Sequence, residues 1–189
     1  MPDIATPPLP GLLVLTPRRH ADARGVFEET WNRAALARAG ILTDFVQDNR
    51  SLSLAPNTVR GLHFQAPPRA QAKLVRCGRG CVLDVAVDLR RGSPTYGHWH
   101  GEELSEENGR QLLIPEGFAH GFVTREAGCE LCYKCSAPYD PAAEGTLRWD
   151  DPELGIAWRL TGPAVLSERD AAAPPLRGLA SPFLWEAAA

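Results

Sequence analysis

Short hydrophobic runs separated by Gly, Pro and Asn fill most of this sequence. From position 42 onward the runs are DFVQDNRSLS, TVRGLHF, KLVRC, CVLDVAVDL, YGHWHGEEL, RQLLIP, HGFVT and ELCYKC. Many short strands at regular spacing, with few helices, are typical of an antiparallel sandwich or barrel. The pattern therefore predicts an all-β fold.

The run CVLDVAVDL has the sharpest alternation. Its larger apolar residues share one face, namely Leu83, Val85, Val87 and Leu89. The other face carries Asp84, Ala86 and Asp88, because successive side chains of a strand point to opposite sides. We expect the first face to lie in the core and the second to form the polar wall of a cavity.

The flanking segments differ from this strand-rich region. Residues 1–16 contain four prolines before LLVL, which predicts an extended arm ending in a short strand. Asp22 to Gly25 is turn-like and Val26 to Trp31 is predicted as a strand. Asn32 to Ala39 has helical composition and stops at Gly40, so we expect the longest helix there.

The C-terminal part reads as loop. DPAAEGTLRWDDPELGIAW follows Tyr139 and is expected to be anchored by Trp149 and Trp158. The Ala/Pro-rich tail from Ala171 is predicted to lie on the surface or against a neighbour. The length of 189 residues suits one domain over 1–189, with a core of about 11–170 and a tail of 171–189.

Charge and hydropathy exclude several partners. A net charge of -3 and a pI near 6.0 argue against a nucleic-acid-binding protein, whose basic surface would show in the totals. The N-terminal apolar run is too short to span a bilayer and has no basic leader. We expect a cytoplasmic protein with a small soluble ligand, no nucleic acid and no membrane.

The five cysteines are an odd count, so we expect reduced thiols rather than a disulfide framework. Cys129, Cys132 and Cys135 form a C-x2-C-x2-C run, which raises the alternative of zinc. A structural zinc site needs four ligands, usually as separated pairs, and this run reads as a strand. Buried thiols are the favoured interpretation.

The stretch RGLHFQAPPRAQAK has the strongest chemical content. It holds Arg60, His63 and Lys73 within a short span. A His near its working pKa can take a proton from carbon, while Arg and Lys can hold a carbonyl oxygen that becomes negative. These groups suit enolisation; a surface strand with one hydrogen-bonded His is the alternative.

A second motif is IPEGFAH, in which Pro115 and Gly117 shape a turn before His120. Pro-x-Gly-x-x-His is the second half of the cupin signature of jelly-roll barrels. Metal cupins also carry an earlier His-x-His and a downstream Glu, whereas the earlier segment here, GLHFQ, has one His. His98 and His100 have the spacing without an adjacent ligand set, so no metal is expected.

Several segments together resemble the dTDP-4-dehydrorhamnose 3,5-epimerase family. They are RGLHFQ-PP-AQ-KLV, DVAVDLR-GSPT-G-W, ELS-EN-RQLLIPEGFAHGF, YK, RWDDPELGIAW and LSERD, and the resemblance runs from about Gly11 to Asp170. It implies a cupin-type jelly-roll barrel with an N-terminal arm and a few short helices, working without metal or cofactor. It also implies a homodimer with exchanged N-terminal strands and a dTDP-4-keto-6-deoxyhexose substrate.

The resemblance implies a role for each candidate catalytic residue. His63 would be the base that removes protons next to the C4 ketone, and Asp170 would orient its ring. Tyr133 would return a proton from the opposite face. Lys73 would hold the enolate oxygen, poised by Asp84.

Further residues are implied to bind substrate, and the family pattern alone distinguishes them from solvated charges. Polar contacts to the sugar and diphosphate would come from Arg60 and His120. The nucleotide half would be bound by Arg24, Glu29, Gln47, Asp48, Asn49, Tyr139, Glu144 and Arg169. Two departures from the family, Val26 and Ala137-Pro138, lie where thymine packing would be affected.

Three alternatives stay open at this stage. A mono-epimerase would invert only C3 or C5 of a related nucleotide 4-keto-sugar. A non-catalytic sugar-nucleotide-binding cupin would incorporate no solvent deuterium into the sugar. A metal cupin would lose activity on exhaustive chelation.

Overall fold

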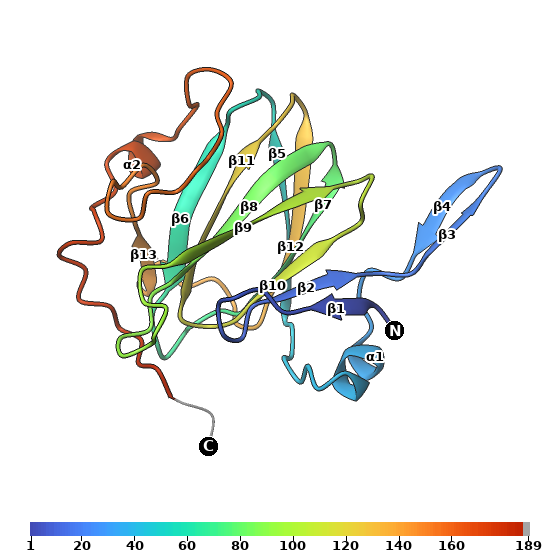
Figure 1. The fold of residues 1–189 in the computed structure, drawn as a ribbon, viewed down its shortest axis with the longest axis horizontal. Helices are drawn as coiled ribbons and strands as arrows, with labels where there is room; N and C mark the ends of the chain where they lie inside the picture. Colours follow the sequence, from blue (N-terminus) through green and yellow to red (C-terminus); the bar gives the residue numbers. More distant parts are fainter. Residues whose placement is uncertain (187–189) are drawn as a thin grey trace.

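The computed structural model describes residues 1–186 and contains two antiparallel sheets (Figure 1). The six-stranded sheet has the order β1 (Asp3–Ala5), β2 (Leu13–Thr16), β10 (Gln111–Ile114), β7 (Lys73–Arg79), β12 (Cys129–Cys135), β5 (Gln47–Ser53). The five-stranded sheet has the order β13 (Glu144–Thr146), β6 (Val59–Gln65), β11 (Phe118–Thr124), β8 (Cys81–Asp88), β9 (Trp99–Ser105). The predicted all-β, jelly-roll-like architecture is confirmed.

One hydrophobic cluster joins the inner faces of the two sheets. It includes Val75 and Leu131 from the six-stranded sheet and Val82, Ala86 and Phe122 from the five-stranded sheet. Alternation in the strands sends these side chains inward and leaves their neighbours outward. Apolar side chains thus fill much of the space between the two sheets. The polar cleft described below lies in the remaining part.

A second cluster lies on the outer face of the five-stranded sheet, and the C-terminal segment covers it. Leu176 and Phe183 are buried there, and the rings of Phe64 and Phe183 meet edge to face at 5.8 Å. The expectation that the tail lies on the surface or against a neighbour was wrong for these residues. Both side chains pack on the chain's own five-stranded sheet, whereas Leu184 is 66% exposed, and residues 187–189 of the tail lie outside the described residues. The predicted anchors Trp149 and Trp158 contact the same cluster.

The covered outer face also corrects the interpretation of β8. Every residue from Val82 to Asp88 is buried, so the strand has no solvent-facing side. The face expected to be a polar wall is mixed, because Ala86 packs in the inner core whereas Asp84 reaches the cleft. A second layer of chain on one side of a sheet produces this double burial.

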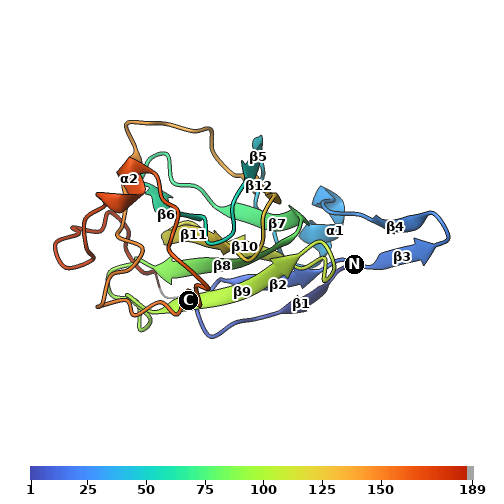
Figure 2. The ribbon, with the colours of Figure 1, turned by 90° about the horizontal axis from the view of Figure 1, so that it is seen from above.

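The N-terminal arm begins with β1 paired to β2 and continues into a hairpin of β3 (Arg19–Asp22) and β4 (Gly25–Glu28). The hairpin projects from the body in both views (Figures 1 and 2). Its turn lies where predicted, but β4 ends at Glu28, before the expected limit at Trp31. Phe27 is 72% exposed at this projecting hairpin.

Two short helices complete the described part of the chain. The predicted helix is α1 (Arg33–Arg38), where the Asn32 side chain accepts the N–H of Ala35 and Gly40 follows with φ of +81°. The second, α2 (Glu168–Ala171), was not predicted and begins at the capping hydroxyl of Ser167. Within residues 1–186 no helix has the length and apolar character needed to cross a membrane.

Candidate active site

A His–Asp pair links the five-stranded sheet to α2. His63 Nε2 lies 2.7 Å from Asp170 Oδ1, and the N–H of Gly61 donates to the other carboxylate oxygen over 3.2 Å. Burial alone would raise the pKa of Asp170, but the hydrogen bonds and the charge of His63 outweigh it and hold that pKa below its ordinary value. Asp170 is therefore a carboxylate that fixes the orientation of the His63 ring.

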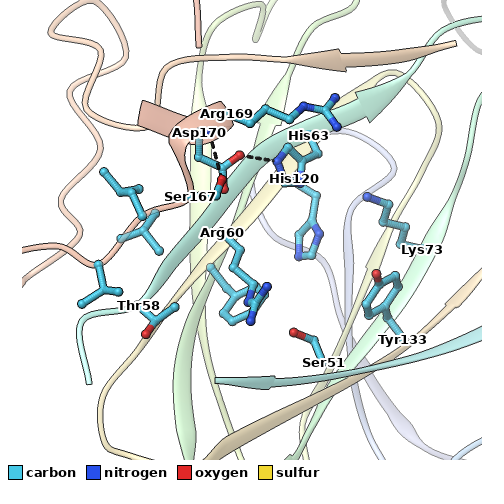
Figure 3. A pocket seen from close by; sticks show the side chains of 14 residues that line it. Ser51, Thr58, Arg60, His63, Lys73, His120, Tyr133, Ser167, Arg169 and Asp170 are labelled. Atoms are coloured by element: carbon cyan, nitrogen blue, oxygen red, sulfur yellow. Dashed lines mark hydrogen bonds and ion pairs between the residues drawn. The ribbon is translucent and has the colours of Figure 1, made fainter. Parts of the chain in front are cut away.

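The opposite wall of the cleft belongs to the six-stranded sheet. Lys73 begins β7 and Tyr133 lies on the neighbouring β12, and Figure 3 shows both side chains on the same side of the cavity. Burial raises the pKa of Tyr133, so its phenol keeps its proton and can donate it. Burial lowers the pKa of Lys73, an effect partly opposed by Asp84 and other nearby acidic groups.

A second His–Asp pair lies deeper in the cleft. His120 on β11 pairs across the sheet with His63, and its Nε2 lies 2.8 Å from Asp84 Oδ2. Burial lowers the pKa of His120, with Asp84 opposing the shift. Asp84 Oδ1 is buried without a hydrogen-bond partner among residues 1–186.

Two adjoining cavities share His63, Lys73 and Tyr133. The first has a volume of about 430 Å³ and is lined further by the candidates Arg60, His120, Arg169 and Asp170. It also has lining residues that sequence reasoning missed, namely Ser51, Thr58, Val59, Phe122, Val165, Leu166 and Ser167. Strand alternation would have found Phe122, two positions after His120 on β11, and Ser51, two positions after Asn49 on β5. No such period applies to Thr58, Val165, Leu166 and Ser167, which lie outside the strands and helices.

The second cavity, of about 340 Å³, brings together Gln47, Asn49, Tyr139 and Glu144. The hydroxyl of Tyr139 donates to Glu144 over 2.6 Å, and Arg169 contacts the same carboxylate at 2.8 Å. Burial by itself would raise the pKa of Glu144, but these two hydrogen bonds bring it below its ordinary value. An open aromatic ring beside amide and charged groups suits a polar heterocyclic ligand.

This second cavity also contains residues that were not predicted. They are Phe64, Gln65, Gln71 and Cys135. Gln65 alternates with His63, and Cys135 with Tyr133, so strand periodicity applied to the known candidates would have found both. Gln71 lies in the loop before β7, where no period applies.

Three expected binding residues do not reach the cleft within this chain. Arg24 sits at the hairpin tip, where its 90% exposed side chain pairs with Asp22. Glu29 accepts a hydrogen bond from Asn32 beside α1. Asp48 points out of the opposite face of β5 and pairs with Lys134 at 2.8 Å.

Of the residues weighed for metal binding, His98 and His100 line neither cavity, whereas His120 lines the first and Cys135 the second. His100 on β9 faces Glu102 at 3.3 Å, and residues 1–186 contain no group of three or more His, Cys, Asp or Glu arranged to hold an ion. The C-x2-C-x2-C run lies along β12, whose alternation puts Cys132 on the face opposite Cys129 and Cys135.

The arrangement suits proton transfer at carbon. His63 and Tyr133 come from different sheets and line the same cavity, so a flat reactant bound between them would have an imidazole at one face and a phenol at the other. Lys73 is placed to hold an oxygen that gains charge in the same plane.

Comparisons with known proteins agree with this chemistry. A profile of dTDP-4-dehydrorhamnose 3,5-epimerase matches residues 6–178. The chain is 51% identical over 176 residues to the dTDP-4-dehydrorhamnose 3,5-epimerase of Sinorhizobium fredii, covering 91% of this chain and 88% of that protein. The chain therefore belongs to the dTDP-4-dehydrorhamnose 3,5-epimerase family.

Solved structures show the same likeness in three dimensions. A dTDP-6-deoxy-D-glucose-3,5-epimerase from Legionella pneumophila, in complex with dTDP-4-keto-L-rhamnose, superposes with a TM-score of 0.95 at 40% identity, covering 99% of this chain and 100% of that one. A 3'-monoepimerase from Streptomyces bikiniensis, in complex with dTDP-quinovose, gives 0.85 at 34% identity, with coverages of 90% and 86%.

Proposed function

We propose that this protein is an epimerase that inverts C3 and C5 of dTDP-4-keto-6-deoxy-D-glucose through an enolate. The observation that carries the proposal is the convergence of the His63–Asp170 pair, Lys73 and Tyr133 on one cleft. Membership of the epimerase family and the dTDP-sugar ligands of its solved relatives support the substrate class.

The first half-reaction is proton abstraction. His63 takes the hydrogen next to the C4 ketone, and the C–H electron pair forms a carbon–carbon double bond while the carbonyl electrons move to oxygen. The ammonium of Lys73 stabilises the resulting enolate oxygen, an interaction that strengthens as charge develops. Asp170 stabilises the imidazolium that forms.

The second half-reaction is protonation from the other side. The enolate electrons return to carbon and take the hydroxyl proton of Tyr133, so the new C–H bond forms on the face opposite His63. Solvent then removes the proton from His63 and restores that of Tyr133. The sequence repeats at the second carbon, because both carbons flank the same ketone.

The nucleotide is proposed to occupy the second cavity. Tyr139 would stack on the base, beside the side-chain amides of Gln47 and Asn49. Arg169 and Arg60 lie toward the sugar cavity, where they suit the diphosphate. Asp48 is not needed for this assignment, because its side chain faces away.

A homodimer is part of the proposal. A lone two-stranded hairpin has little stability in water, and this one exposes Phe27. If two copies exchange these arms, Arg24 and Glu29 can complete the neighbouring cleft. Phe27→Ser should then give monomers by light scattering and weaken dTDP binding, whereas Leu42→Ser, at another exposed apolar residue, should do neither. A dimeric Phe27→Ser protein would contradict the arm exchange.

We also propose a cytoplasmic location, which five free cysteines support because thiols stay reduced there. The mass under denaturing, non-reducing conditions should show no loss from disulfides. Recovery of the native protein outside the cytoplasmic fraction would refute the location.

The decisive experiment follows solvent deuterium in the sugar by NMR. Wild type should label both C3 and C5, whereas His63→Ala should lose exchange by about 10²–10⁴, the usual contribution of a positioned base. Tyr133→Phe should still exchange label, since His63 can return a solvent proton to its own face, while the product keeps its starting configuration. Tyr96→Phe, a tyrosine on the outer cluster, is the matched control and should invert normally.

Each outcome has a distinct meaning. Label at one carbon only would make the protein a mono-epimerase, an alternative kept open by the relative from Streptomyces bikiniensis. Binding of the sugar nucleotide without deuterium exchange would show that the protein is a non-catalytic binding protein. Loss of all activity on exhaustive chelation, restored by metal, would replace this mechanism with metal-assisted enolisation.

A further inference from the structure

The strand β6 breaks the alternation expected of a regular strand. Arg60 and His63 are three positions apart, so a regular strand would place them on opposite faces. Both nevertheless line the first cavity. The side chains of Val59, Leu62 and Phe64 pack in the outer cluster, although Val59 also borders the first cavity and Phe64 the second.

The register between β6 and β11 explains this geometry. His63 pairs with His120 and Arg60 pairs with Phe122, so three steps along β6 match two steps along β11. One extra residue is therefore inserted on β6 between these pairs. Such a β-bulge turns the side chains that follow it to the other face, which lets Arg60 and His63 converge.

Two facing glycines make the bulge possible. Gly61 has a φ of +106°, and a Cβ there would lie 2.6 Å from the carbonyl oxygen of His120 and 2.8 Å from the Cα of Gly121. A Cβ on Gly121 would lie 2.8 Å from the carbonyl oxygen of Arg60. These contacts are backbone atoms, which cannot move aside as a flexible side chain can.

The same bulge holds the partner of the base. The N–H of Gly61 donates to Asp170 Oδ2 over 3.2 Å, and Asp170 Oδ1 contacts His63 Nε2 at 2.7 Å. One buried carboxylate thus ties the bulged backbone to the imidazole ring. A shift of the backbone at Gly61 therefore displaces both the carboxylate of Asp170 and the ring of His63.

We propose that Gly61 and Gly121 are positioning residues, whose close contact sets the bulge that aims His63 and Asp170 at the reacting carbon. This inference rests on the proposed epimerase function. A side chain at either glycine forces β6 and β11 apart and withdraws the base, and a misplacement of about 1 Å costs roughly 10²-fold in rate. The nucleotide cavity should change less, because Gln47, Asn49 and Tyr139 lie on other segments, although Phe64 and Gln65 of β6 also line it.

The test compares Gly61→Ala and Gly121→Ala with Gly101→Ala on β9 of the same sheet. A Cβ on Gly101 would meet only the side chains of Leu83 and Trp99, at 3.1 and 3.2 Å. Thermal melting establishes folding, calorimetry gives the Kd for dTDP, and deuterium exchange gives the rate. The two test variants should lose about 10²-fold in kcat with a much smaller change in the Kd for dTDP, while the control stays near wild type.

Two further measurements separate positioning from general damage. The proton on the His63 ring nitrogen that faces Asp170 should give a low-field NMR signal in wild type and in Gly101→Ala, and this signal should shift or vanish in Gly61→Ala. In a His63→Ala background, Gly61→Ala should cause no additional loss of the residual exchange.

The overturning results are equally defined. A folded Gly61→Ala enzyme with wild-type kcat, or one whose dTDP affinity falls as much as its kcat, would contradict the inference. If Gly61→Ala does not melt cooperatively, Gly121→Ala is judged by the same criteria. Absence of exchange in wild type would instead refute the proposed function and would be seen before any variant is made.

Discussion

Two aspartates on β8, Asp84 and Asp88, show how differently one strand can use a buried charge. Both have no measurable exposure. Asp88 is fully paired: its carboxylate accepts hydrogen bonds from Arg90, Ser93 and Thr95. Among residues 1–186, Asp84 has a side-chain hydrogen bond to His120 through one oxygen, and its other oxygen has no hydrogen-bond partner.

The difference separates a structural carboxylate from a functional one. At the C-terminal end of β8, Asp88 stabilises the turn that follows the strand through these hydrogen bonds. The guanidinium of Arg90 lies over the rings of Phe118 and Trp185. At the cleft end, Asp84 keeps unused hydrogen-bonding capacity beside His120 and Lys73. A buried charge left incompletely paired is costly for stability, so its presence in a cleft points to a role with substrate.

The largest effect should come from substitution of Asp88, at the C-terminal end of β8. Asp88→Ala leaves the largely buried Arg90 without its counter-charge and should lower the free energy of unfolding by about 3 kcal/mol. Urea melts measure this loss, and deuterium exchange per folded molecule should stay at the wild-type rate. A variant that is stable but inactive would show that Asp88 is not the structural carboxylate and would contradict the comparison with Asp84.

Substitution of Asp84, which reaches the cleft, should lower activity and leave stability nearly unchanged. Asp84→Asn keeps the shape but removes the charge beside His120, and a hydrogen bond to a charged group contributes about 1.5 kcal/mol, so kcat/KM should fall roughly tenfold. The free energy of unfolding should change by less than about 1 kcal/mol, because a partly unpaired buried charge is removed at the same time. Severe destabilisation with normal activity would show that Asp84 is structural.

The smallest effect is the pH dependence of stability. Burial raises the pKa of Asp88, but its hydrogen bonds to Arg90, Ser93 and Thr95 bring it below the ordinary value. A carboxyl group whose pKa is lowered by folding stabilises the protein above its unfolded pKa of about 3.9, and that contribution is lost as pH falls through the folded pKa. The stability gap between wild type and Asp88→Asn should therefore be constant from pH 7 to about pH 5 and shrink below about pH 4. Urea melts that give an equal gap at neutral and strongly acidic pH would contradict this assignment.

The sequence by itself determined much of this protein. Short alternating runs predicted the strands, Asn32 and Gly40 marked the limits of α1, and alternation on β12 placed Tyr133 and Lys134 on opposite faces. Resemblance to one family then supplied half of the residues that line the two cavities. These features depend on local patterns or on motifs, so they can be predicted from the amino-acid sequence alone.

Tertiary structure decided the rest, because it depends on contacts between distant segments. His63 and Asp170 meet across 107 positions, and Arg60 joins His63 only through a bulge that the pairing with β11 creates. Leu176 and Phe183 of the tail are buried because the outer face of the five-stranded sheet is apolar, and Arg24 is left outside the cleft because its hairpin projects. Strand periodicity fixes which residues share a face within one strand, but register, bulges and the layer that covers a sheet arise only when the strands pack together.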